Sequence, residues 1–97
     1  MTTKQRAHLK SLAMKIEPIF QIGKSGVTPE LTSAIAEALE ARELIKINVL
    51  KNCTDDGNSM AQILAERTHS EVVQVIGKKI VLYKQAKDEN KRKIILP

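Results

Sequence analysis

The stretch Ile19-Phe20-Gln21-Ile22-Gly23-Lys24-Ser25-Gly26-Val27-Thr28-Pro29 joins an apolar run to the start of a helix, and the fold is built around it. Gly23 and Gly26 permit φ > 0 and a close approach to a ligand, which residues with a Cβ rarely allow. Thr28 is a suitable N-cap, and Pro29 fits the first helical position. The order predicts a short strand, a tight loop and a helix whose first N–H groups point toward the loop. An oxyanion, most often a phosphate, suits such a place.

The Gly23-Lys24-Ser25-Gly26 loop admits two other interpretations. Its first three residues match the end of the nucleoside-triphosphate loop G-x-x-x-x-G-K-[ST], but Pro18 stands where that pattern needs its first glycine. We therefore discount an ATPase or a GTPase. The other interpretation is a turn that needs glycine for its geometry alone, and the loop by itself leaves this alternative open.

The patterns on either side of the loop predict the other elements. Apolar residues at helical spacing indicate three helices, and alternating or β-rich runs indicate four strands. Pro18 ends the first helix because it forces the preceding residue out of the α region. The expected elements are a helix over 3–16, a strand over 19–22, a helix over 29–42, a strand over 44–50, a helix over 60–68, and strands over 72–76 and 80–83.

This order indicates a single α/β domain over residues 1–97. The strand, helix and strand within 19–50 form a right-handed βαβ unit with parallel strands. The last two strands read as an antiparallel hairpin with the basic turn Gly77-Lys78-Lys79. A basic tail follows over about 84–97, and its apolar end, Ile94-Ile95-Leu96-Pro97, is expected to dock on the domain.

Charge is distributed unevenly along the chain. The net charge is +5, with five basic and one acidic residue in 1–29, four basic and eight acidic in 30–71, and seven basic and two acidic in 72–97. A fold that brings the two ends together would have a positive face and an acidic back, as polyanion-binding proteins do. Because Phe20 and Tyr83 are the only aromatic residues, contacts would go to the nucleic-acid backbone and not to stacked bases.

Patterns for catalysis and metal binding are weak. His8 and His69 lie in different elements and complete no catalytic arrangement. Cys53 is the only cysteine, so it forms no disulfide or cysteine zinc site and is expected at the core or its edge. Asp55 and Asp56 resemble the start of a calcium loop, but the later ligands are missing at the required spacing. We expect no enzyme and no cofactor.

No apolar run is long enough to span a membrane, so a cytoplasmic protein is expected.

Taken together, these motifs resemble a stand-alone CRM domain, the YhbY-like family of small RNA-binding proteins. The likeness rests on the loop, the Thr28-Pro29 cap, Glu43-Leu44-Ile45-Lys46 and Val75-Ile76-Gly77-Lys78, and it covers nearly the whole chain. Membership implies a mixed four-stranded sheet with three helices, similar to the C-terminal domain of bacterial translation initiation factor three. It also implies association with ribosomal RNA in precursors of the large subunit, without catalysis.

The resemblance also suggests which residues contact RNA. Gly23, Lys24, Ser25 and Gly26 match the family's RNA-contacting loop, and the basic first helix matches its usual cationic neighbour. The sequence leaves open whether the hairpin end and the last strand share a side with the loop. The expected contacts are Gly23, Lys24, Ser25, Gly26, Lys4, Arg6, Lys10, Lys78, Lys79 and Lys84.

A second hypothesis is a protein-interaction module. The second helix carries an acidic outer face, Glu37, Glu40 and Glu43, that could contact a basic partner such as a ribosomal protein. A solvated helix face explains the same residues. Under either hypothesis we expect a monomer with no membrane partner.

Overall fold

Capping residues set where the helices begin. Thr2 and Gln5 form a capping box, in which the Gln5 N–H donates to Thr2 Oγ1 (3.1 Å) and the Thr2 N–H donates to Gln5 Oε1 (3.0 Å). Thr28 and Asp56 cap the other two helices through their side-chain oxygens.

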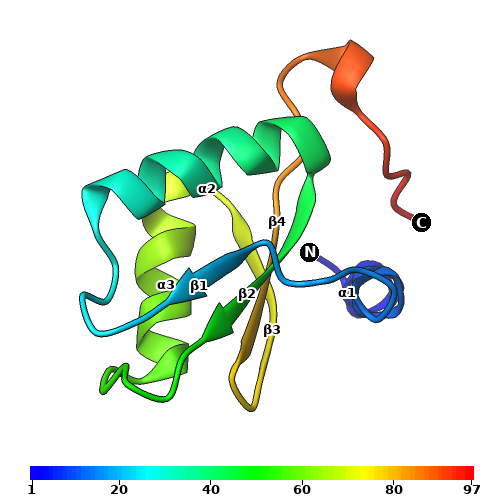
Figure 1. The fold of residues 1–97 in the computed structure, drawn as a ribbon. Coiled ribbons are helices and arrows are strands. Elements are labelled where there is room, and N and C mark those ends of the chain that lie inside the picture. Colours follow the sequence, from blue (N-terminus) through cyan, green and yellow to red (C-terminus); the bar gives the residue numbers. More distant parts are fainter.

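The computed structural model describes residues 1–97 (Figure 1). Its elements are α1 (Thr3–Ala13), β1 (Phe20–Ile22), α2 (Pro29–Arg42), β2 (Leu44–Val49), α3 (Gly57–Thr68), β3 (Glu71–Ile76), β4 (Lys79–Tyr83) and the 3₁₀ turn η1 (Glu89–Lys91).

The order and types of the helices and strands agree with the sequence prediction, the 3₁₀ turn is additional, each strand differs by one residue at one end, and the larger differences lie at two helix ends. The first helix ends at Ala13 and not at Ile16, because the last N–H groups bond three residues back and tighten the chain before Pro18. The third helix begins at Gly57, three residues earlier than expected, because Asp56 accepts from the Ser59 N–H (3.2 Å) and acts as its cap. The sequence did not indicate this first helical turn, because residues 57–59 have the composition of a turn.

The four strands form one mixed sheet in the order β1-β2-β4-β3. β1 and β2 are parallel neighbours joined through α2, which confirms the βαβ unit, and β4 pairs antiparallel with both β2 and β3. The β3–β4 ladder contains an irregularity between Val72 and Gln74, so Val73 is an extra residue in β3. The predicted α/β fold with three helices and four strands is therefore confirmed.

Helices cover the two faces of the sheet unequally (Figure 1). α2 and α3 lie on one face, where the larger core includes Ile35, Leu39, Ile47, Leu64 and Leu82, all with no exposed surface. Cys53 is buried in this core, as expected. α1 alone packs on the opposite face, over a smaller core. That core comprises Leu9, Ala13, Leu44, Val73, Val81 and Tyr83. Part of the second face is consequently left without a helix.

The C-terminal tail is held by two carboxylates of the acidic helix end. Glu43 is fully buried and accepts from the backbone N–H groups of Ala86 (2.8 Å), Lys93 (2.6 Å) and Ile94 (3.0 Å). Glu40 accepts from the backbone N–H groups of residues 87 and 88, which directly follow Ala86. The expectation that Glu43 belongs to an exposed acidic face is wrong. Its position just after α2, with φ of 67°, turns the side chain inward toward the tail.

The end of the tail docks on α1. Ile94 and Leu96 pack against the smaller core, and Gln5 Nε2 donates to the Pro97 carbonyl (3.3 Å). Ile95 between them is 90% exposed, so the docking alternates along the chain. The two ends of the sequence, both basic, thus meet on one side of the molecule. None of the helices is long and apolar enough to cross a membrane.

The carboxylates that hold the tail make acid a destabilising condition. Burial acts to raise the pKa of Glu43, but hydrogen bonds from three backbone N–H groups outweigh it, so the pKa is lowered. Backbone hydrogen bonds from Lys87 and Asp88 lower the pKa of Glu40. Because both pKa values are depressed on folding, their stabilisation is complete above the unfolded value of about 4.3 and is lost as pH falls through the folded values. Urea unfolding between pH 6 and pH 3 should show this loss, and a Glu43→Gln variant should show a shallower one.

Candidate nucleic-acid interface

The glycine loop is a tight turn between β1 and α2. The Gly26 N–H donates to the Gly23 carbonyl (3.0 Å), and Lys24 and Ser25 are exposed at the tip. Gly26 has φ of +66° and is buried, so it is the position that requires glycine. Gly23 lacks a positive φ, and a Cβ there would meet its nearest neighbours at an ordinary 3.5 Å. The expectation that both glycines supply positive φ therefore holds for Gly26 alone.

One flank of this loop is acidic. A Cβ at Gly26 would lie 2.8 Å from Asp55 Oδ2, which places that carboxylate directly against the loop. A hollow on the same flank is lined by Ser25, Asp55 and Asp56, together with residues of α3 that include one cation, Arg67. Carboxylates repel phosphate, so a polyanion would approach the loop from its other side, toward the face of the sheet that carries α1.

The hairpin turn lies at the same end of the sheet as the loop (Figure 1). At the end of β2, the Leu50 N–H donates to the Ile22 carbonyl (2.8 Å) on one side, and the Val49 N–H donates to the Lys78 carbonyl (2.7 Å) on the other. The loop and the turn thus flank the same strand end. This settles a question the sequence left open, because it brings Lys78 and Lys79 to the side of Lys24.

Mostly polar side chains cover the part of the sheet that α1 leaves open; the exposed exception is Ile76, which is 61% exposed and lies opposite Lys79 at the hairpin end. Lys46 and Asn48 point to this face from β2, opposite the buried Ile45, Ile47 and Val49. Lys79 Nζ donates to Asn48 Oδ1 (2.6 Å) across the β2–β4 pair. The strand register adds Gln21 beside Asn48, and Gln74 in the same row as Lys46 and Val81. We call Gln21, Lys46, Asn48, Gln74 and Lys79 the open sheet face.

Sequence reasoning missed Lys46, Asn48, Gln21 and Gln74 as candidate interface residues. A signal was present, since the run 44–50 alternates apolar and polar residues. β2 is an interior strand of the sheet, and polar residues there are expected only where one face meets water. The alternation therefore indicated an open face, although not which other strands extend it.

The first helix contributes less than expected, and its cations divide between two flanks. α1 packs near Leu44 and Tyr83, five residues along β2 from the loop end, a separation of about 17 Å. Arg6 Nη1 donates to the carbonyls of Val72 (2.5 Å) and Val73 (2.8 Å), so this guanidinium holds the irregular part of β3. Helix α1 is therefore not an immediate neighbour of the loop.

The remaining α1 cations follow from the helical period. Lys10 is exposed on the Arg6 flank, which borders the open sheet face, whereas Lys4 is exposed toward the opposite flank. Gln5 marks that opposite flank, because it contacts the C-terminal residue. Of the predicted residues, Lys10 thus borders the open sheet face and Lys4 does not.

Lys84 lies at the far end of the sheet from the loop. Its N–H donates to the Glu43 carbonyl (2.9 Å), just beyond the pairing of Leu44 with Tyr83. The structure therefore gathers Lys24, Lys78 and Lys79 and leaves Lys84 apart from them.

The acidic helix face is mostly occupied from within the molecule. Glu43 is buried and Glu40 accepts two backbone N–H groups of the tail, as described above. Only Glu37 of the three remains exposed without such bonds. The alternative function as a protein-interaction module through this acidic face therefore lacks the surface it needs.

Comparisons with known proteins point in one direction. A search against protein families matches residues 1–84 to the CRS1 / YhbY (CRM) domain. The chain is 52% identical over 92 residues to the protein named Probable RNA-binding protein YqeI of Bacillus subtilis (strain 168), covering 95% of each chain. It is 32% identical over 97 residues to a protein of Haemophilus influenzae named RNA-binding protein, covering 100% of this chain and 95% of that one.

A solved structure has the same fold. The solution structure of the hypothetical protein SAV1595 from Staphylococcus aureus superposes with a TM-score of 0.80 at 47% sequence identity. The match covers 100% of this chain and 99% of the other. The arrangement of helices and strands described above is thus shared with a protein of similar sequence.

Proposed function

The chain belongs to the CRS1 / YhbY (CRM) domain family, and from this premise we propose that it binds RNA through a surface that joins the glycine loop to the open sheet face. The relatives reported above are named as RNA-binding proteins. Within that function, we propose ribosomal RNA of the large-subunit precursor as the ligand, bound by a cytoplasmic monomer that carries out no catalysis.

The observation that carries the proposal is the polar composition of the open sheet face. Lys46 and Asn48 occupy an interior strand, and both remain partly exposed on the face opposite α2 and α3. Three cations, Lys24, Lys78 and Lys79, stand at one end of this face, and Lys10 borders the other. Ammonium groups neutralise phosphates, and amide side chains can donate to phosphate or sugar oxygens, so the surface suits an RNA backbone.

The same geometry limits how sequence-specific the binding is. No aromatic ring belongs to the open sheet face, because Phe20 and Tyr83 pack against the two cores. Base stacking is the usual means of reading single-stranded RNA, and this surface does not supply it. Selection would then rest on the shape of the RNA, with contacts mainly to its backbone.

Charge reversal at the loop tests the proposal. Lys24→Glu and Lys46→Glu should each weaken binding to large-subunit ribosomal RNA. If about four phosphates are neutralised on single-stranded RNA, log affinity against log salt should have a slope of about −3. Each variant should make that slope shallower by about 1. Fluorescence anisotropy over a salt series, with circular dichroism to verify folding, measures both quantities.

Lys4→Glu is the matched control. It makes the same charge change on an exposed residue, but on the flank of α1 that faces away from the open sheet face. It should leave the slope close to that of the wild type, apart from the general effect of net charge. Equal losses in all three variants would indicate attraction by net charge alone. An unchanged slope in Lys24→Glu and Lys46→Glu would place the RNA elsewhere.

A further inference from the structure

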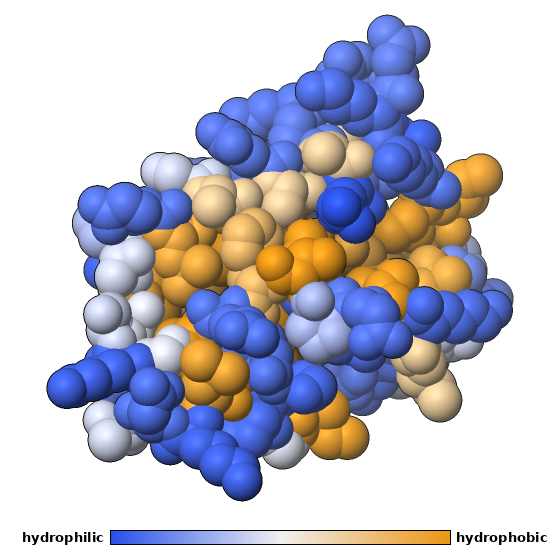
Figure 2. All heavy atoms as spheres, viewed as in Figure 1, coloured by the Kyte–Doolittle hydropathy of each residue, from blue (hydrophilic) through white to orange (hydrophobic).

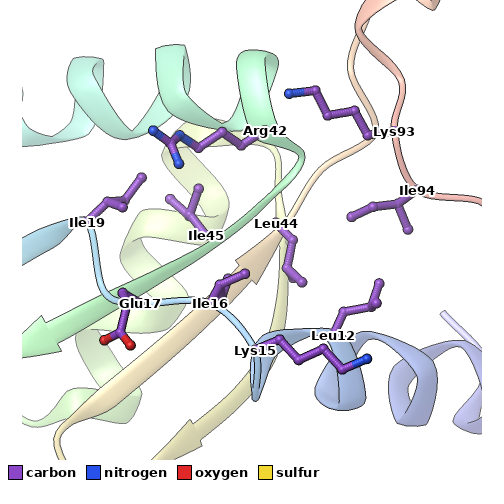
Figure 3. Close-up of a pocket in the computed structure, with 10 residues that line it drawn as sticks. All are labelled: Leu12, Lys15, Ile16, Glu17, Ile19, Arg42, Leu44, Ile45, Lys93 and Ile94. Carbon is purple, nitrogen blue, oxygen red and sulfur yellow. The ribbon is translucent and has the colours of Figure 1, made fainter.

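An apolar groove opens on the side of the molecule where α1, the end of α2 and the tail meet. It has a volume of about 530 Å³. Figure 2 shows apolar atoms exposed across the middle of this view, bordered by hydrophilic side chains. The close-up shows aliphatic side chains from α1, β2, the chain leading to β1 and the C-terminal tail around one space (Figure 3). Those six are Leu12, Ile16, Ile19, Leu44, Ile45 and Ile94.

Cations surround this apolar floor. Lys15, Arg42 and Lys93, all exposed, come from three separate segments and line the groove. Glu17 is the one carboxylate among the lining residues, and Figure 3 shows it pointing away from the aliphatic side chains. The groove therefore combines an aliphatic interior with a positive rim.

The tail wall of the groove is fixed in place. The N–H groups of Lys93 and Ile94 both donate to the buried Glu43 carboxylate. Ile94 is also packed against the core beneath α1. A groove whose wall is held by buried hydrogen bonds is formed before a ligand arrives, which reduces the entropic cost of binding.

We propose that this groove binds an acidic segment of a protein partner, with one or two large apolar side chains seated on its floor. Exposed apolar surface rimmed by polar residues is typical of protein-interaction sites. Three cations against one averted carboxylate select carboxylates in the segment that flanks the anchors. The groove uses other residues than the RNA surface, whose cations Lys24, Lys78 and Lys79 stand at the opposite end of the sheet.

Two other occupants fit less well. An RNA base would find no aromatic ring among the lining residues, and only the guanidinium of Arg42 could stack on it, so a base fits the aliphatic floor less well than an apolar side chain does. A second copy of this chain would bring the exposed apolar residues Met14 or Ile95, which are 83% and 90% exposed. Met14 lies next to Lys15, and Ile95 lies near Lys93; both of these cations also line the groove. Docking of a second copy would therefore bring like charges together.

The probes are three short synthetic peptides. The first carries leucines at helical spacing with glutamates between them, the second has lysine for each glutamate, and the third has serine for each leucine. Methyl NMR spectra of the full chain should show shifts for Ile16, Ile19 and Ile94 with the first peptide only. Shifts with the lysine peptide, or none with any peptide at millimolar concentration, overturn the proposal.

Paired variants separate this site from the RNA surface. Arg42→Glu/Lys93→Glu reverses two rim charges and should lower the affinity for the acidic peptide by about tenfold. Lys24→Glu/Lys78→Glu makes the same charge change at the far end and should leave peptide binding unchanged. RNA affinity should show the opposite response. It should fall in Lys24→Glu/Lys78→Glu and stay close to the wild-type value in Arg42→Glu/Lys93→Glu. If the rim pair lowers RNA affinity instead, or if RNA displaces the peptide, the groove belongs to the RNA surface and the proposal is wrong.

Discussion

Glu43→Gln should lower the free energy of unfolding by about 2 kcal/mol, although the change is nearly isosteric. In the wild type, one carboxylate oxygen accepts from Ala86 and the other from Lys93 and Ile94. A glutamine amide offers one acceptor, so its NH₂ group must face a backbone donor and leave at least one N–H unpaired. Such buried unpaired groups cost about 1–3 kcal/mol each. The melting temperature should fall by about 8–16 °C.

A graded series shows whether hydrogen bonding is the cause. Glu43→Ala removes all three acceptor contacts and should cost more than Glu43→Gln. Glu37→Gln, at an exposed position of the same helix without such bonds, should change stability by less than about 0.5 kcal/mol. Urea unfolding followed by circular dichroism gives each value. If Glu43→Gln were as stable as the wild type, the tail would not depend on the ionised carboxylate.

The same variant connects stability with the proposed groove. Lys93 and Ile94 should lose their fixed position, so the acidic peptide should bind more weakly to Glu43→Gln than to the wild type. RNA binding at the loop end, about 17 Å away along β2, should be retained at temperatures where the variant is folded.

The sequence was sufficient for the elements, for the parallel pair of the βαβ unit and for the antiparallel β3–β4 hairpin, but not for the pairing of β2 with β4. Thr28-Pro29 marks a helix start by a cap and a fixed φ, and both work through neighbouring residues. Parallel pairing of β1 with β2 follows from the short helical connection between them. These inferences needed only local rules and the handedness of βαβ units.

The roles of charged side chains could not be read in the same way. Glu43 and Glu37 both fall outside the apolar stripe of the helix in the sequence pattern, yet Glu43 is buried because a segment 43 to 51 residues later returns to it. Arg6 was expected to contact RNA, but its guanidinium reaches carbonyls 66 and 67 residues away. Such partners are set by tertiary contacts, which spacing within one element does not encode.

The two ends of the chain illustrate a partial success. Their basic charge was expected to make one positive face, and the ends do meet where Gln5 contacts Pro97. The glycine loop, however, lies at the other end of the sheet (Figure 1). Cations therefore border two surfaces, the open sheet face near Lys24 and the apolar groove near Lys93. Charge counting along the sequence cannot distinguish one positive face from two.

Gly26→Ala should be the most damaging of the single alanine substitutions at the glycines. Its φ of +66° costs an L-residue about 1–2 kcal/mol. The new Cβ would also lie 2.8 Å from Asp55 Oδ2, so that carboxylate must move. We expect a total loss of about 2–3 kcal/mol in the free energy of unfolding. Urea unfolding at neutral pH measures this loss.

Two other glycines of the chain supply matched controls for that loss. Gly77→Ala has the same strain, with φ of +57°, but nothing lies within 4 Å of the new Cβ, so it should cost about 1–2 kcal/mol. Gly23→Ala, without a positive φ, should stay within about 0.5 kcal/mol of the wild type. In an Asp55→Ala background, the cost of Gly26→Ala should fall to that of Gly77→Ala, because only the contact has been removed. If Gly26→Ala lost the same free energy of unfolding in both backgrounds, the whole loss would come from the backbone strain of the positive φ.

RNA affinity of the same variants then decides what the loop glycines are for. If glycine serves only the turn, Gly26→Ala should lose stability and, where it remains folded, bind RNA as the wild type does. If the backbone approaches phosphate closely, Gly23→Ala should bind RNA more weakly while its stability is unchanged, since the fold itself tolerates a Cβ at 3.5 Å from its neighbours. Stability and affinity thus separate at Gly23, the one loop glycine whose conformation does not require glycine.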